Sequence, residues 1–280
     1  MLLFQSQEVL SNNSSLIESN TLRVCGCLVV PVEETRRKAV KKFILLSLLA
    51  TLTLFTLSAS AANLYFYGGD FDNNNALAHG LANETDGTVT GTPYGAATFQ
   101  NFVVSDNQIN VTGMFTNDIM DLNPPPATAY WEIRSGVSEG NGGTLIASGT
   151  GADSLTATGR ERNGRSEYTN LVQGLNVNLT AGTYWFAVVP QSPNDPAGRS
   201  FNTNSLEGLN TVGTQISNQQ YFDSAFFGFS FTNANTQIAD AFPTFSSGVY
   251  ADVVPEPSSL IMLGSGVLAA AGVLRRRISR

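Results

Sequence analysis

Short segments in which apolar and polar residues alternate run through residues 63–253 and favour an all-β fold. Residues 129–135 (AYWEIRS) place Trp131 and Ile133 on one face, with polar side chains between them. Residues 184–189 (YWFAVV) form a continuous apolar run that stops at Pro190. Alternation with a period of two is typical of a half-buried strand, and a short continuous run is typical of a strand buried on both faces.

The same reading predicts strands along the rest of this region, separated by clusters of Asn, Gly, Asp and Pro such as 123–126, 140–143 and 192–198. Within residues 175–189, Thr180-Ala181-Gly182 is expected to turn the chain between two strands. The other predicted strands are 63–67, 97–104, 108–115, 143–149, 153–160, 168–173, 221–231 and 248–253. Many short strands joined by turns indicate one antiparallel β-sandwich domain over 63–253, of jelly-roll type.

The charges of this domain are strongly biased. Residues 63–253 hold 17 Asp and Glu, five Arg and no Lys, a net charge of −12. A nucleic-acid partner needs a basic stripe that neutralises phosphates, so we expect no nucleic acid here. The negative charge favours solubility outside the cell.

The residues that carry common nucleophilic catalysis are missing from the domain. His79 is the sole histidine, Cys25 and Cys27 both precede residue 63, and there is no G-x-S-x-G sequence. Triads of Ser or Cys with His and Asp therefore lack their parts in any usual arrangement, and we expect a non-enzymatic protein. A carboxylate-dependent glycoside hydrolase remains as an alternative, since two facing acids suffice for that reaction.

One loop has the spacing of a calcium site. Asp70, Asp72 and Asn74 alternate along a polar segment, and hard oxygen ligands suit Ca²⁺. An EF-hand is excluded, because Asn75 and Leu81 stand where that loop has Gly and Glu. A polar loop closed by its own Asx turns explains the residues equally simply.

Aromatic residues are numerous enough for both a core and a sugar-binding face. Aromatic rings can stack on the apolar face of a sugar, so an exopolysaccharide-binding module is a second alternative. Alternating Phe227, Phe229 and Phe231 are more typical of a core. The candidate residues are Tyr130, Trp131, Tyr184, Trp185, Phe186, Tyr221, Phe222, Phe226, Phe227, Phe229 and Phe231.

The N-terminal region predicts export. Residues 36–42 are basic, 43–57 are apolar, and Ala59-Ser60-Ala61 is a small-residue motif for signal peptidase, with cleavage after Ala61 or Ala62. Residues 40–62 are therefore predicted to be a secretory signal peptide. Residues 1–39 form an extension without periodic pattern, and a start codon at Val40 would leave a leader of ordinary length.

The C-terminal region combines three elements in order. Residues 254–257 (Val254, Pro255, Glu256, Pro257) form an extended Pro-containing motif, and residues 258–274 carry no charge. A helix of that length spans about 25 Å and predicts a transmembrane segment. Arg275, Arg276 and Arg277 follow as a cytoplasmic membrane stop.

This arrangement over 254–280 resembles the PEP-CTERM sorting signal of Gram-negative bacteria, also called the ice-binding protein C-terminal domain. The resemblance implies export through the inner membrane, recognition of residues 254–257 by an exosortase, removal of the helix, and release or attachment at the cell surface. It implies no ice binding. Residues 130–190 also resemble a hairpin of bacterial extracellular sandwich domains, which supports the fold alone.

Overall fold

The computed structural model describes residues 63–71, 80–85, 93–122, 125–191, 199–205, 209–237, 244–254 and 257–278. Antiparallel strands make up most of it, which confirms the all-β prediction. The strands are β1 (Leu64–Tyr67), β2 (Gly80–Ala82), β3 (Ala96–Met120), β4 (Thr128–Ser135), β5 (Thr144–Ala152), β6 (Ser154–Arg162), β7 (Arg165–Gln191), β8 (Ser200–Ser205), β9 (Tyr221–Ser224), β10 (Phe229–Asn233), β11 (Thr244–Phe245) and β12 (Ser247–Val253). The described helices are α2 (Ala234–Gln237) and α3 (Pro257–Ile278).

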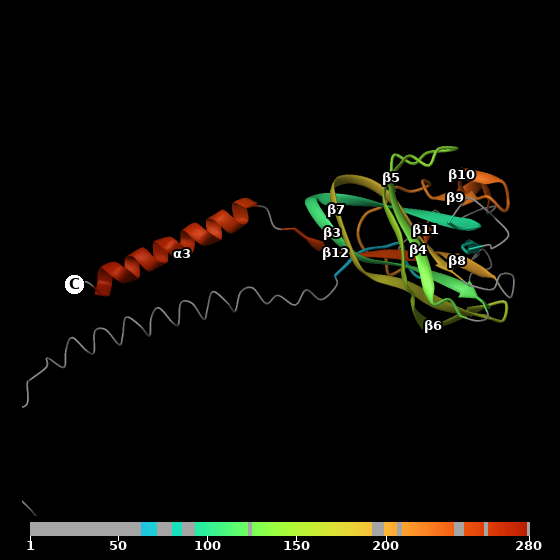
Figure 1. The fold of residues 1–280 in the computed structure, drawn as a ribbon, viewed down its shortest axis with the longest axis horizontal. Helices are drawn as coiled ribbons and strands as arrows, with labels where there is room; N and C mark the ends of the chain where they lie inside the picture. Colours follow the sequence, from blue (N-terminus) through green and yellow to red (C-terminus); the bar gives the residue numbers. More distant parts are fainter. Residues whose placement is uncertain are drawn as a thin grey trace, which may run out of the picture. The chain divides into compact units, whose positions relative to one another are not determined.

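Two very long strands, β3 and β7, form the spine of the domain (Figure 1). They have 25 and 27 residues and pair antiparallel from Gln100↔Phe186 to Met120↔Ser166. On its other edge β3 pairs with β12, β8 and β9, while β7 pairs with β4 and β6. Every other described strand joins the sheet at this ribbon or at a strand paired to it, as β1 joins β12 and β5 joins β4.

The ribbon bends in its middle, where the sequence predicted a chain reversal. The turn expected at Thr180-Ala181-Gly182 is wrong, because β7 continues through these residues as one strand. The predicted strands 97–104 and 108–115 are likewise both parts of β3. Opposite that segment the pairing shifts register between Val104 and Gln108. Bulges of this kind bend a strand without ending it, so turn-forming residues here produce a bend.

The main hydrophobic core lies between the two halves of the bent ribbon. Phe102 and Val104 precede the bend, Ile109 and Val111 follow it, and all four belong to one buried cluster. Phe66 of β1 packs there against the Phe102 and Phe186 rings, with centroid distances of 6.0 and 6.2 Å. Two sheet halves packed face to face are the arrangement of a sandwich; the jelly-roll type stays a prediction.

The apolar run at 184–189 is buried on both faces, as predicted. Phe186 and Val188 point into the main cluster, whereas Trp185, Ala187 and Val189 join a second cluster. The second cluster also contains aromatic side chains from β4, β9 and β10. β7 is therefore covered on both sides in this segment.

The strand predicted at 221–231 is a hairpin. β9 and β10 pair antiparallel, and residues 225–228 form the turn, with Gly228 at φ +72°. Phe226 and Phe227 lie in this turn, are 53% and 45% exposed, and stack edge to face at 4.8 Å. Phe231, by contrast, is buried in the second cluster.

Candidate functional site at the end of β12

The last strand of the domain leads directly into the C-terminal segment. β12 lies between β1 and β3, and its final residue, Val253, pairs with Ile109. One residue later, the Val254 backbone N–H still donates to the Gln108 carbonyl oxygen at 3.0 Å. The chain is thus held in the sheet up to the first residue of the predicted sorting motif.

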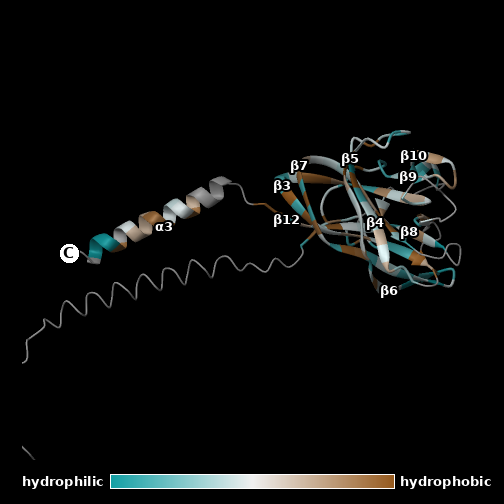
Figure 2. Cartoon of the chain, in the orientation of Figure 1, coloured by the Kyte–Doolittle hydropathy of each residue, from teal (hydrophilic) through white to brown (hydrophobic). Residues whose placement is uncertain are grey.

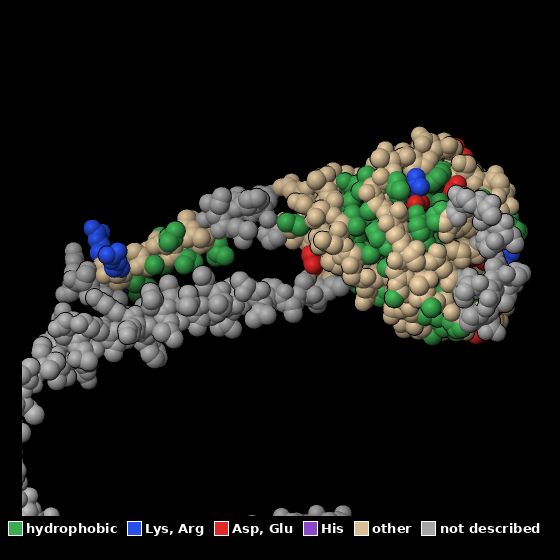
Figure 3. All heavy atoms as spheres, in the orientation of Figure 1, with side chains coloured by type: hydrophobic (Ala, Val, Ile, Leu, Met, Phe, Trp, Pro, Cys, Tyr) green, Lys and Arg blue, Asp and Glu red, His purple; other side chains and the backbone are tan. Residues whose placement is uncertain are grey.

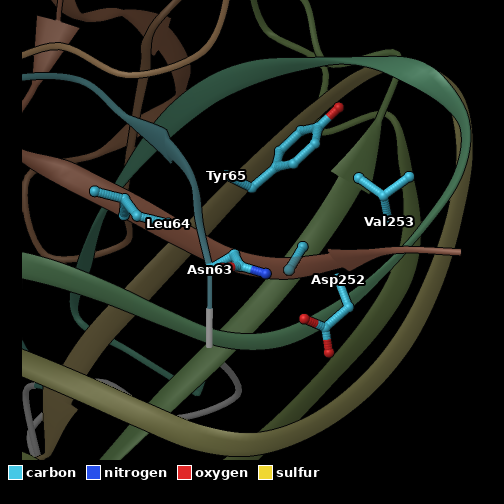
Figure 4. A pocket seen from close by; sticks show the side chains of 6 residues that line it. Asn63, Leu64, Tyr65, Asp252 and Val253 are labelled. Carbon is cyan, nitrogen blue, oxygen red and sulfur yellow. The ribbon is translucent and has the colours of Figure 1, made fainter. Parts of the chain in front are cut away.

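The start of β1 lies beside this end of β12. The Ala251 backbone N–H donates to the Asn63 carbonyl oxygen at 2.9 Å, and Leu64 pairs with Tyr250. A hollow of about 550 Å³ opens between the start of β1 and the end of β12, lined by Asn63, Leu64, Tyr65, Ala251, Asp252 and Val253 (Figure 4). Figure 4 shows Tyr65 and Val253 on one side of β12 and Asp252 on the other.

Tyr65 is fixed in this hollow by the bend of β3. Its hydroxyl donates to Asp106 Oδ2 at 2.7 Å and accepts the Ser105 backbone N–H at 3.3 Å. Burial and the hydrogen bond to Asp106 raise the pKa of Tyr65. Around it, the larger apolar side chains stay open to solvent, with Leu64 37% and Val253 53% exposed.

The predicted C-terminal helix is present as α3, with an apolar middle and a basic end (Figures 2 and 3). Arg275, Arg276 and Arg277 occupy its last turn, where positive charge complements the helix dipole. The predicted transmembrane span at 258–274 is not supported, because no helix among the described residues is long and apolar enough to cross a membrane. The stretch 264–266 (Gly-Ser-Gly) adds little hydropathy to its middle, and the three arginines end the apolar stretch.

A group of charged side chains is buried inside the domain. Glu167, with its side chain fully buried, accepts hydrogen bonds from Thr203 at 2.8 Å and Thr158 at 2.7 Å, and pairs with Arg160. Arg160 also pairs with Asp70 at 3.0 Å. The Arg160 guanidinium and the two threonine hydroxyls therefore compensate the buried Glu167 carboxylate. The sequence did not predict these contacts, because the partners lie far apart along the chain.

Asp118 is a second fully buried acid of this interior. It accepts hydrogen bonds from the Asn170 amide at 2.6 Å, the Thr116 hydroxyl at 2.9 Å and the Asn83 amide. Burial raises the pKa of Asp118 well above its usual range, although the hydrogen bonds from Thr116 and Asn83 oppose the shift. The Asp153 and Glu167 carboxyls lie close enough for their charges to add to this rise in the pKa of Asp118.

Near the second core cluster, Glu132 forms a further buried ion pair. Its side chain is 1% exposed, and its Oε1 accepts from Arg134 Nε at 2.8 Å, while Oε2 accepts from the Tyr130 hydroxyl at 2.9 Å. Arg134 lies over the Phe231 ring at 5.2 Å. Glu132 is therefore held by two donors inside the domain.

The calcium prediction at Asp70, Asp72 and Asn74 stays a prediction, because the last two residues lie outside the described ranges. Asp70 accepts hydrogen bonds from the Tyr67 hydroxyl at 2.6 Å and Asn210 at 2.5 Å, besides the ion pair with Arg160. Although burial opposes the shift, these donors and the Arg160 charge lower the pKa of Asp70. A carboxylate already neutralised by an arginine is a poor ligand for a cation.

Several predicted sites lie outside the described residues: the extension 1–39, the signal peptide 40–62 with Ala59, Ala61 and Ala62, His79, and Pro255 and Glu256 of the sorting motif. Of the aromatic candidates, Trp185 and Tyr221 are buried and Trp131 is half-buried. The exposed large aromatic side chains in the described part of the chain are Phe226 and Phe227.

The family model for the PEP-CTERM protein-sorting motif matches residues 253–277. The C-terminal segment is thus a PEP-CTERM motif, which implies exosortase-dependent sorting to the cell surface or the extracellular space. The match concerns the sorting motif alone and gives no support to the name ice-binding protein C-terminal domain.

No curated protein matches the chain. Among solved structures, the chain is similar to the cysteine protease and lectin-like domains of Cwp84, a surface layer associated protein of Clostridium difficile. The identity is 16%, the TM-score is 0.38, and the match covers 57% of this chain and 33% of that chain. The chain spans about a third of that protein's length, and similarity at this level defines neither a shared fold nor a shared activity.

Proposed function

We propose that this protein is a non-enzymatic β-sandwich of the cell surface or extracellular matrix, exported with a signal peptide and sorted by an exosortase that recognises residues 254–257. Signal peptidase would release the N-terminus near Asn63, and the exosortase would remove α3. The observation that carries the proposal is the PEP-CTERM match over 253–277, which begins where the last strand of the domain ends.

The interior of the domain supports a non-enzymatic role. Its buried acids, Asp118, Glu132 and Glu167, accept hydrogen bonds from neighbouring side chains and do not line the hollow at the end of β12. A hydrolase would need two acids facing a substrate cleft.

The test is the intact mass of the protein recovered from the surface and the medium of the native cell. The expected species starts near Asn63 and lacks α3, and Glu256→Ala keeps α3. Glu161→Ala, an exposed acid on β6, serves as the matched control and is processed like the wild type. A wild-type protein that retains residues 258–280 would contradict the proposal.

A second candidate function, binding to exopolysaccharide, is favoured by the exposed β9–β10 turn. Phe226 and Phe227 are 53% and 45% exposed there, and the Arg199 guanidinium lies over the Phe227 ring at 5.9 Å. The aromatic rings can contact the apolar face of a sugar, and the guanidinium, which has several N–H donors, can contact its hydroxyl groups.

Pull-down with the exopolysaccharide of the native cell tests this candidate. Phe226→Ser combined with Phe227→Ser is expected to reduce the bound fraction at least tenfold, whereas Leu145→Ser, an equally exposed apolar residue on β5, leaves it unchanged. Equal binding by both variants would show that the turn is not the sugar-binding site.

A further inference from the structure

We propose that the hollow between the start of β1 and the end of β12 is the surface on which the exosortase docks while it holds the sorting motif. This inference rests on the proposed function and deepens it, since it assigns part of the enzyme's recognition to the folded domain. The partner is a protease whose surface presents apolar side chains to Leu64 and Val253.

The length of chain between the sheet and the motif sets the first constraint. Val254 is still hydrogen-bonded to Gln108, and Glu256 follows two residues later. An extended chain covers at most about 3.5 Å per residue, so the Glu256 Cα lies within roughly 7 Å of the Val254 Cα. This distance is shorter than the spacing of about 10 Å between two β-sheets stacked face to face. An enzyme that closes around Glu256 therefore reaches the end of β12 at the same time.

The chemistry of this end supplies the second argument. Leu64 and Val253 are apolar residues exposed by 37% and 53%, although both stand in paired strands. A partner that covers the hollow would bury both side chains, and burial of apolar surface favours association. Tyr65, held by Asp106, gives the hollow a fixed wall.

The alternative is that the enzyme avoids the domain because the end of β12 peels away from the sheet. That would break the bonds Val254 N–H to Gln108 and Ala251 N–H to Asn63. The two mechanisms predict opposite effects of a spacer. If the enzyme docks on the domain, separating motif and domain slows processing. If the sheet merely obstructs the enzyme, a spacer accelerates processing.

The experiment follows the rate of C-terminal processing of the full chain in its native cell by pulse-chase and mass spectrometry. An insertion of six Gly and Ser residues between Val253 and Val254 is expected to slow processing at least threefold. Val253→Asp and Leu64→Asp are each expected to slow it at least fivefold. Leu145→Asp, 47% exposed on β5, is the matched control and keeps the wild-type rate.

Thermal unfolding of each variant shows whether its domain is folded. Where an Asp variant does not fold, Val253→Thr and Leu64→Thr keep the strand and are expected to slow processing at least twofold. Wild-type rates in the folded surface variants, or faster processing with the spacer, would overturn the docking surface. If the wild type itself is not processed, the proposed function fails instead.

Light scattering of the released mature protein tests a different occupant. The docking surface predicts a monomer in both wild type and Val253→Asp. A wild-type dimer that Val253→Asp dissociates would assign the hollow to a second copy of the chain and overturn the proposal.

Discussion

The backbone N–H of Ala251 donates a hydrogen bond to the carbonyl oxygen of Asn63 at 2.9 Å. Asn63 is the expected first residue of the mature chain, and Ala251 stands three residues before the sorting motif. Residues next to the two predicted processing sites are therefore hydrogen-bonded to each other, although the 191 residues from 63 to 253 separate the two sites along the chain.

This neighbourhood predicts an order of processing. A signal peptide that remains attached at Asn63 continues from the hollow beside the sorting motif, so its bulk and its membrane anchoring oppose access of the exosortase. Ala59→Leu combined with Ala61→Leu, which blocks signal peptidase, is expected to slow C-terminal processing several-fold in pulse-chase measurements. Unchanged C-terminal processing in that variant would show that the two steps are independent.

Asp153 predicts a pH dependence of stability. Burial raises the pKa of Asp153 from 3.8 to about 7, and its Oδ2 has no partner, while Oδ1 accepts the Leu171 N–H at 3.0 Å. The folded state thus binds this proton more tightly than the unfolded chain, and this contribution to stability is lost as pH rises from about 4 to about 7. Asp153→Asn keeps the acceptor and should add about 1–2 kcal/mol at about pH 8, after allowance for partial exposure, and little at about pH 4.

Urea unfolding at both pH values measures the difference between variant and wild type. Asp121 is the control of opposite sign, because hydrogen bonds from the Arg199 backbone and the charge of Arg165 lower the pKa of Asp121. Asp121→Asn is expected to lose stability at neutral pH and to match the wild type in acid. A gain for Asp121→Asn at neutral pH would contradict this electrostatic account.

Arg160 and Glu167 form an ion pair inside the domain, and removal of one partner alone is expected to destabilise the fold. Arg160→Leu leaves the fully buried Glu167 carboxylate without its cation, at a cost of about 3 kcal/mol in the free energy of unfolding. The double variant with Glu167→Gln should recover part of this loss. Denaturant unfolding of both single variants and the double variant measures the coupling, and strictly additive losses would refute it.

Any side chain at position 68 is expected to lower the stability of the fold. A Cβ at this position would overlap the carbonyl oxygen of Phe245, which is held in β11, so Gly68→Ala should cost about 2 kcal/mol or more. Gly136, at φ +66° with open space around it, should lose about 1 kcal/mol on substitution by Ala through its left-handed backbone alone. Chemical denaturation compares the two, and equal losses would rule out the steric explanation.

The strands were predictable where apolar and polar residues alternate in the sequence. Residues 129–135 and 248–253 alternate, and they are β4 and β12 almost residue for residue. The bend of β3 and β7 was not predictable, because Ser-Asp-Asn and Ala-Gly have the same local preferences in a bulge as in a turn. Only pairing with the neighbouring strand decides between the two.

The buried polar residues could not be predicted from the sequence for a related reason. The predicted strand ended at Phe115, since the alternation of apolar residues stops there, yet β3 continues to Met120 with Asp118 completely buried. Asp118 can be buried because Asn83 and Asn170, 35 and 52 residues away, donate hydrogen bonds to it. The sorting signal, in contrast, could be read from the sequence because its elements are consecutive.

The long β3–β7 ribbon limits how early the domain can fold. Gln100 pairs with Phe186 and Met120 with Ser166, so the ribbon closes loops of 86 and 46 residues. Contacts of such high sequence separation form slowly. A chain that emerges from its N-terminus must therefore expose most of the domain before the spine can assemble, and until then its apolar segments are available to chaperones, proteases and each other.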